Sequence, residues 1–294
     1  MAAETTITSI TEIVPSEKIG EIVMDYAHDL MPIAGLCAER QLPPNSGKVY
    51  SFPRWVADAH EDITTEGTTA LTNTELETTE SSITVAQIGL GRELTKMAQR
   101  TNILGPALLQ HMMMDAATTL ALAIEDDLAA LFTSITDSVG TTTVNLAIVD
   151  MLSAIAAQRV NLVQGQLEFV LATIQVEDLN AAIAASSASL FTGNANQSTV
   201  NARMSGLVGQ FLDANVWVSS LCDTANAGAD RVGACINNGR ISPTRPSLGL
   251  VNFWFAELDT DKDIYLLTDR FAWSACYGVG LIGDAYSVKI VTDA

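Results

Sequence analysis

The sequence predicts an α+β chain with an extended β-ribbon, a long helix and a mixed sheet. Three observations predict this class: two strand-like segments joined by a long acidic connection, one helical pattern of unusual length, and an irregular alternation of strands and helices after residue 141. The chain has 294 residues, of which 48% are hydrophobic, so it can bury a substantial core. Disorder throughout the chain is therefore excluded.

The charge balance is strongly acidic. Lys and Arg number 15 against 34 Asp and Glu, which gives a formal net charge of −19. Recognition of phosphates needs clustered Lys and Arg, so this balance excludes a dedicated nucleic-acid binder and a polybasic membrane anchor. The first residues lack the basic and apolar regions of a signal peptide, and no apolar run approaches the ~18 residues of a membrane-spanning helix.

The four cysteines do not form a metal or redox motif. Cys37, Cys222, Cys235 and Cys276 are scattered and include no CxxC pair. We expect free, buried thiols in a reducing cytoplasm.

Residues 1–47 predict an arm with one short helix. Apolar residues recur at helical spacing between Ile19 and Leu30, and Pro32 ends the pattern. A short helix followed by the loop 41–47 cannot close a core alone, so the arm must pack on the rest of the chain or on a neighbour.

Residues 48–56 predict a strand, which Pro53 restricts to an edge or an exposed ribbon, and residues 83–94 predict its return strand. The connection between them contains no Lys or Arg and seven acids: Asp58, Glu61, Asp62, Glu66, Glu75, Glu77 and Glu80. One interpretation is a surface insertion. The other is a long β-ribbon that leaves its own domain and lies on another subunit, because structureless loops beyond ~15 residues are uncommon in compact domains.

The next segment predicts one long helix over residues 103–135. Its i+4 stripe consists of Leu104, Leu108, Met112, Ala116, Leu120, Ile124 and Leu128. Pro106 lies in the first turn, where its missing N–H costs nothing. At 1.5 Å per residue this helix would be ~50 Å long, about the diameter of a compact chain of this length. We therefore expect a flat or elongated subunit built along a spine.

Residues 141–294 predict an α/β region with a mixed sheet. A helix ending at Gly165 is expected to bury the face formed by Val149, Leu152, Ala156, Val160 and Val163. A second helix is expected over residues 175–187. Strands are expected at 167–173, 214–220, 253–258, 264–268 and 286–292.

The sequence contains no complete motif for catalysis or for cofactor binding. The glycine pattern of dinucleotide-binding sites occurs at Gly278, Gly280 and Gly283. Too few residues follow it for the helix and the acidic residue that such a site requires. The run from Asp259 to Asp263 resembles a calcium loop without its required Gly and Glu. The three histidines are isolated. We predict no catalytic, metal-binding or cofactor-binding residues and no enzymatic activity.

The order of the segments resembles the major capsid protein of tailed bacteriophages, which has the Hong Kong 97-type fold. The resemblance covers essentially the whole chain, and its best local segments are residues 46–55, 85–102 and 105–131. It also includes the acidic run Glu125–Asp127, the strand-then-helix step at 167–182 and the segment 204–220, which lacks the proline common before that strand. The order of the segments carries the resemblance more than any single motif.

The resemblance implies four parts. These are an N-arm (1–47), an E-loop β-ribbon (48–95), a P-domain with the spine helix (96–140 and 280–294) and an A-domain (141–279). It implies a structural protein of the virion, assembled in the host cytoplasm into hexamers and pentamers of a closed icosahedral head around double-stranded DNA. Because the arm begins almost at Met1, we expect a separate scaffolding protein and a portal as partners. The resemblance also allows decoration proteins as partners, and it implies no membrane.

The ribbon is the predicted site of contact between subunits. The candidate residues are Arg54, Trp55, Glu61, Asp62, Glu66, Glu75 and Glu77. Lys48 lies at the ribbon root, so the Lys–Asn cross-link of some relatives is not carried over. Two alternatives stay open: the shell of an encapsulin-type bacterial nanocompartment, and a soluble α/β enzyme or binding module with an acidic insertion.

Overall fold

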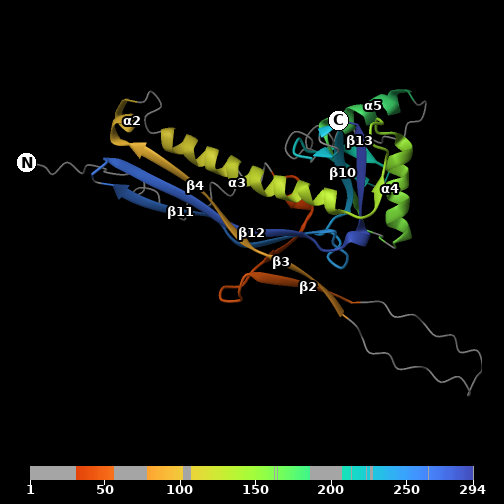
Figure 1. Cartoon of the computed structure of the whole chain (residues 1–294), viewed down its shortest axis with the longest axis horizontal. Coiled ribbons are helices and arrows are strands. Elements are labelled where there is room, and N and C mark those ends of the chain that lie inside the picture. Colours follow the sequence, from red (N-terminus) through yellow and green to blue (C-terminus); the bar gives the residue numbers. More distant parts are fainter. Residues whose placement is uncertain are drawn as a thin grey trace, which may run out of the picture.

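The computed structural model of the chain describes residues 31–55, 78–101, 107–161, 163, 165–185, 207–212, 214–222, 224–225, 228–263 and 265–293. The molecule is elongated (Figure 1): a long helix lies along a four-stranded sheet, a second sheet with two helices forms the other end, and a two-stranded ribbon lies beside both. The α+β class with one long helix is therefore confirmed.

The four-stranded sheet has the order β1-β11-β12-β4. Its strands are β1 (Ala38–Gln41), β11 (Leu248–Asp263), β12 (Thr268–Leu281) and β4 (Ala86–Thr95). Strand β1 is parallel to β11, whereas β11–β12 and β12–β4 are antiparallel. The short helices η2 (Ala34–Leu36) and α2 (Lys96–Thr101) precede β1 and follow β4.

The spine helix is α3 (Ala107–Ser134), 28 residues or ~42 Å long. The predicted i+4 stripe is buried in its described part, at Ala116, Leu120, Ile124 and Leu128. This stripe packs on side chains of β12 that include Phe271 and the fully buried Trp273. Met112, which belongs to the same stripe, and Met113 lie partly buried at the edge of the same core.

The second sheet has seven strands. Its path is β5-β13-β10-β6-β8-β7, and β9 pairs with β10. The strands are β5 (Ser138–Val139), β13 (Ser287–Asp293), β10 (Asp230–Asn237), β6 (Leu167–Leu171), β8 (Ala214–Val218), β7 (Leu207–Phe211) and β9 (Thr224–Ala225), and the short helix η4 (Asp284–Tyr286) precedes β13.

Both faces of this sheet are covered, which explains why β6 is buried along its whole length. Phe169 and Cys235 face the helices α4 (Ile148–Val160) and α5 (Thr173–Ala185). Val170 and Ala234 point to the opposite face, into the core that contains α3. Because successive side chains of a strand point to opposite faces, the same sheet contributes to both cores.

Three sequence-based predictions are wrong. The segment 264–268 is not a strand, since Tyr265–Leu267 form the turn between β11 and β12. The segment 83–94 is not one return strand: β2 (Val49–Trp55) pairs with β3 (Thr78–Thr84), whereas β4 pairs with β12. Finally, α4 buries the face opposite to the predicted one, with Met151 and Ala154 inward.

Two other parts of the prediction lie outside the described residues. These are the arm helix between Ile19 and Leu30 and the start of the spine helix at 102–106.

Candidate assembly surfaces

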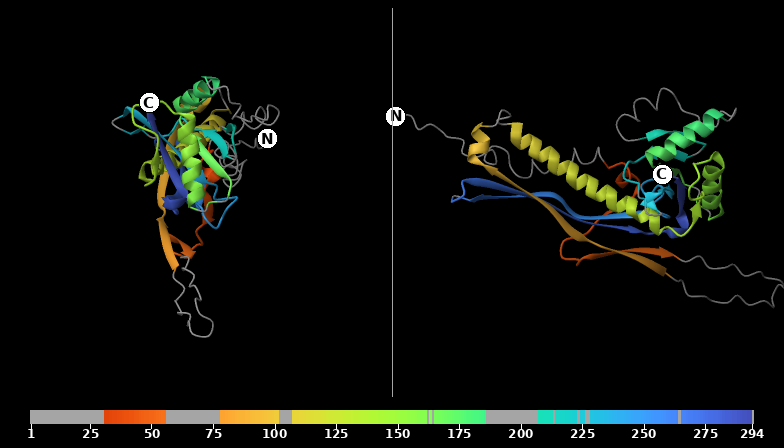
Figure 2. Two further views of the ribbon diagram at one scale, coloured as in Figure 1. Left: turned by 90° about the vertical axis from the view of Figure 1, so that its right-hand side faces the viewer. Right: turned by 45° about the horizontal axis from the view of Figure 1, so that its top comes forward.

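The ribbon of β2 and β3 forms a separate two-stranded sheet beside the two large sheets, and it packs on them at its root (Figure 2). Its ladder runs from Val49 opposite Thr84 to Trp55 opposite Thr78. An isolated two-stranded ribbon is marginally stable in water, so its root needs apolar cover. A small core supplies it, formed by Ala38, Leu42, Phe52, Ile83, Val85, Val251, Cys276 and Ile282.

Two glycines of β12 let the ribbon root approach closely. A Cβ atom at Gly278 would lie 2.5 Å from the backbone oxygen of Thr84, and one at Gly280 would lie 2.8 Å from Cγ1 of Ile83. Such distances are shorter than van der Waals contact, so an alanine at either position would force the ribbon root to shift. Gly278 and Gly280, the first two glycines of the sequence that resembles a dinucleotide site, therefore lie within strand β12 and serve the packing of the ribbon, whereas Gly283 follows the strand.

Arg54 contacts its own chain. Its guanidinium carbon lies 5.9 Å from the ring centroid of Tyr286, and that of Arg245 lies 5.8 Å from the same centroid. Both distances are within the range of cation–π attraction. Of the other predicted contact residues, Trp55 is described only as part of strand β2. Glu61, Asp62, Glu66, Glu75 and Glu77 lie outside the described residues.

The turn between β11 and β12 is an apolar tip at the free end of the four-stranded sheet. Tyr265 is 98% exposed, and Leu266 and Leu267 are also exposed. The carboxylate of Asp263 fixes the turn by accepting the backbone N–H groups of Tyr265 (2.9 Å) and Leu266 (3.0 Å). A stable turn that exposes three large apolar side chains is typical of a contact surface.

The tip is also tied to the neighbouring strand. The backbone N–H of Lys96, at the start of α2, donates to the carbonyl of Leu267 at 3.0 Å. Arg270 binds Glu93 of β4 at 2.6 Å and Asp263 of β11 at 3.5 Å. We call the exposed side chains of Tyr265, Leu266, Leu267 and Met97 the distal tip.

Helix α4 carries a second exposed apolar surface. Val149, Leu152, Ala156 and Val160 follow one another at helical spacing, and all four are exposed, Val149 by 67% and Val160 by 79%. We call these four residues the α4 stripe. The sequence pattern identified the stripe correctly but assigned it to the core, because the inward face of α4 is apolar as well.

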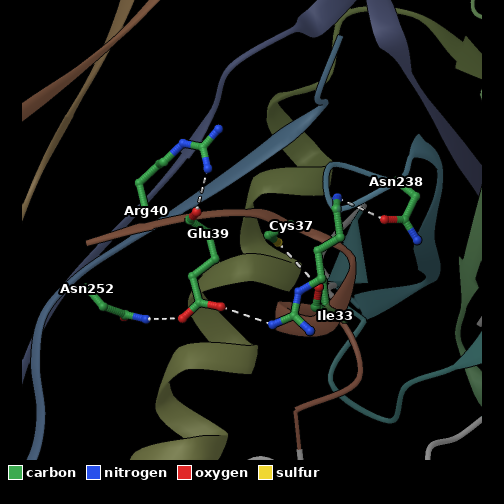
Figure 3. Close-up of polar contacts among 7 residues, drawn as sticks. Ile33, Cys37, Glu39, Arg40, Asn238 and Asn252 are labelled. Atoms are coloured by element: carbon green, nitrogen blue, oxygen red, sulfur yellow. Dashed lines mark hydrogen bonds and ion pairs between the residues drawn. The ribbon is translucent and has the colours of Figure 1, made fainter. Parts of the chain in front are cut away.

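The chain that enters strand β1 is fixed to the body by polar contacts (Figure 3). Glu39 receives hydrogen bonds from Arg240 (3.0 Å) and from Asn252 of β11 (2.9 Å). The backbone N–H of Gly239 donates to Leu36, and a Cβ at Gly239 would lie 2.4 Å from the nitrogen of Ala38. These contacts fix residues 36–41 against strand β11 and the segment 239–240.

The described residues hold no group of three or more His, Cys, Asp or Glu side chains that could bind a metal ion. All four cysteines are free and buried, as predicted. Burial raises the pKa of the Cys222 thiol to about 12 and that of Cys235 higher still, so both are poor nucleophiles at neutral pH. The run Asp259–Asp263 belongs to strand β11 and forms no loop. In the described part of the chain, no helix is long and apolar enough to span a membrane.

Comparison with known proteins finds relatives by structure only. No known family matches the sequence, and no curated protein matches it. Solved structures match across most of the chain. The capsid of Ralstonia phage GP4 aligns with a TM-score of 0.65 over 88% of each chain at 10% identity. A structure from Mycobacterium phage Che8 aligns with a TM-score of 0.61 over 83% of this chain and 85% of that chain, at 16% identity.

A third match is a virus-like particle. A virus-like particle from Pyrococcus furiosus aligns with a TM-score of 0.54 over 93% of this chain and 98% of that chain, at 10% identity. At such low identity the likeness establishes the fold. The chain thus has the fold of tailed-phage capsid proteins, which is the fold that the order of its segments implies.

Proposed function

We propose that this chain is the structural major capsid protein of a tailed phage, which assembles with copies of itself into a closed icosahedral head. The likeness to several phage capsids over more than four fifths of the chain supports this function. In this proposal β2 and β3 are the root of the E-loop, and α3 is the spine of the P-domain. The seven-stranded sheet is the A-domain, so β5 and β13 belong there and not in the P-domain ranges 96–140 and 280–294 that the resemblance implies.

The division between the last two parts follows the packing. The sequence assigns residues 141–279 to the A-domain. However, β11 and most of β12 pack along α3 and not on α4 and α5. We therefore propose that residues 248–281 belong with the spine in the P-domain.

The main support for the proposal is the way in which the ribbon is attached to the subunit. Its two strands pair only with each other, and the small apolar core at its root joins it to the body. A two-stranded ribbon is only marginally stable by itself. It is well suited to reach a neighbouring subunit, and the acids between residues 58 and 77 would then meet basic side chains there.

The exposed apolar surfaces support contacts between copies. Chains that each carry a charge of −19 repel one another, so assembly needs contact surfaces whose burial offsets this repulsion. The distal tip and the α4 stripe meet this condition, and they lie at opposite ends of the elongated molecule (Figure 1). Two separated surfaces allow a continuous lattice, whereas one self-complementary surface allows only a dimer.

The acidic charge also suits the proposed cargo. A shell that encloses DNA without specific binding needs weak contact with phosphates, and residues 101–158 contain no Lys or Arg. A scaffolding protein, a portal and decoration proteins are further partners in this proposal. An encapsulin-type shell is the alternative, since the fold also matches the Pyrococcus furiosus particle. The fold favours both over a soluble enzyme.

Expression of the full chain, alone and with candidate scaffolding proteins from the same gene cluster, tests the function. Negative-stain microscopy should show closed particles, and DNA-filled heads in infected cells would distinguish a phage from a nanocompartment. A chain that stays monomeric under all these conditions would contradict the proposal.

A variant with a shortened ribbon tests the role of the ribbon. Trp55 pairs with Thr78, so replacement of residues 56–77 by Asn-Gly would close the existing ladder with a two-residue turn. We expect this variant to stay soluble and to unfold cooperatively, yet to form no closed shells. Normal shells would refute the proposed role of the ribbon.

A further inference from the structure

The spine helix contains a carboxyl group that points into the core. Glu125 is only 1% exposed, whereas Asp126 and Asp127, which follow it, are exposed. Its Oε1 accepts the backbone N–H of Ile33 at 2.7 Å, across 92 positions of sequence. This bond joins helix α3 to the segment that leads into strand β1.

The second oxygen of the same carboxyl has no partner. Oε2 of Glu125 is buried and makes no hydrogen bond within the described part of the molecule. No ion pair of Glu125 occurs there either. A buried carboxylate without a cation is unfavourable, since its charge has lost the solvation by water.

The titratable groups around Glu125 do not compensate its charge. The thiols of Cys37 and Cys222 respond to it, because the charge of Glu125 contributes to the raised pKa of both. Two cations lower the pKa of these thiols, Arg240 that of Cys37 and Arg231 that of Cys222. Neither cation lowers the pKa of Glu125. Arg240 is already paired with Glu39.

We propose that Glu125 is a proton-controlled clasp that holds the segment 31–37 on the spine helix. The neutral carboxyl closes the clasp, because it accepts the Ile33 N–H without placing a charge in the core. The ionised carboxyl favours opening, because water can reach it only when the segment moves away. The clasp is a property of the single subunit and does not depend on the proposed shell function.

The direction of the pH effect follows from linkage. Burial raises the pKa of Glu125 from 4.5 to about 8, and the N–H groups of Ile33 and Ala34 oppose this shift only in part. The closed state therefore holds its proton more tightly than an open or unfolded state. Its stability is greatest below pH 4.5 and falls as the pH rises to about 8, where it levels off. Between these limits the opening equilibrium rises by up to ~10-fold per pH unit.

Hydrogen–deuterium exchange of the full, unassembled chain tests the clasp. Glu125→Gln keeps an acceptor for Ile33 but cannot ionise, and Asp126→Asn removes an exposed neighbouring charge as the matched control. At each pH the exchange rate of residues 33–37 in the unmodified chain is divided by that in Glu125→Gln, which cancels the intrinsic pH dependence of exchange. We expect this ratio to rise at least tenfold between pH 5 and 8 and then to level off.

Two results would overturn the proposal: a ratio that is flat with pH, or an equal rise in the peptides of β10, which would indicate global unfolding. The ratio of Asp126→Asn to Glu125→Gln should rise like that of the unmodified chain. If Glu125→Gln folds poorly, Glu125→Leu removes the same titration with a side chain of similar volume. Because the measurement uses unassembled chain, its failure would leave the proposed shell function untouched.

Discussion

The guanidinium of Arg54 lies 5.9 Å from the ring centroid of Tyr286, so the ribbon root is bound to the turn that precedes strand β13. Arg245 lies 5.8 Å from the same centroid, and one aromatic ring thus receives two cations from distant parts of the chain. The Nε of Arg54 is buried without a hydrogen-bond partner, so the ring is its principal attraction among the described residues. We expect this contact to help set the orientation of the ribbon.

Arg54→Ala should loosen the ribbon without unfolding the subunit. Removal of one cation–π contact costs ~0.5–1 kcal/mol, which lowers the melting temperature by roughly 2 °C in a chain of this size. Calorimetry should detect this small change, and electron microscopy should detect a larger loss of closed particles. Arg54→Lys keeps a cation over the ring, so its particle yield should lie between that of Arg54→Ala and that of the unmodified chain. Equal particle yields for all three proteins would contradict the role of Arg54.

Gly278→Ala should detach the ribbon root from β12. The added Cβ would meet the backbone oxygen of Thr84, which cannot turn away, so we expect a loss of roughly 1–3 kcal/mol in urea denaturation. Gly91→Ala is the matched control on the same sheet, because nothing lies within 4 Å of its Cβ. We expect that variant to be near neutral. Equal effects at the two positions would show that close approach of the ribbon is not the reason for Gly278.

Replacement of the distal tip should abolish assembly and spare folding. Tyr265→Ser with Leu266→Ser removes two exposed apolar side chains, and exposed substitutions change stability by ~0.5 kcal/mol or less. The melting temperature should therefore stay constant while light scattering detects no large particles. Lys262→Ser, on the same hairpin, is the control and should assemble normally. Assembly by the double variant would remove the tip from the proposed contacts.

A charge on the α4 stripe should have the same selective effect. Val160→Asp places a carboxylate on a surface that we propose to be covered by a second copy, where a buried unpaired charge is costly. Asn180→Asp adds the same charge to an exposed position of α5 and serves as the control. We expect particles from the control and none from Val160→Asp. Normal particles from both variants would assign the stripe to some other role.

Much of the architecture could be predicted from the sequence, because long regular patterns report burial directly. The stripe through Leu120, Ile124 and Leu128 has one apolar side, and the structure buries that side. Helix α4 is apolar on two sides, so its pattern could not distinguish the inward Met151 from the outward Val160.

The segments that the sequence misassigned are those shaped by contacts. Residues 264–267 are an apolar run, which predicts a buried strand, but three of them lie exposed in a turn. Strand β12 was missed because small residues interrupt its apolar pattern, and two of these are glycines required by the ribbon. The exposure of the turn and the need for the glycines become clear only from the positions of the tip and the ribbon in the structure. The acids of the predicted contact site, from Glu61 to Glu77, lie outside the described residues and stay a prediction.

The passage from β3 into β4 has a mechanical consequence. Only Val85 separates the two strands, and it is tied to the carbonyl of Lys48 at 2.9 Å. A pull along the ribbon therefore acts as shear on the β4–β12 ladder, which is in register from Ala86 opposite Tyr277 to Thr95 opposite Thr268. In shear the hydrogen bonds of a ladder carry force together, whereas in peeling they break one at a time. Tension on the ribbon would thus spread along the whole sheet and into the spine helix packed against it, so the subunit would deform elastically before its ribbon tore away.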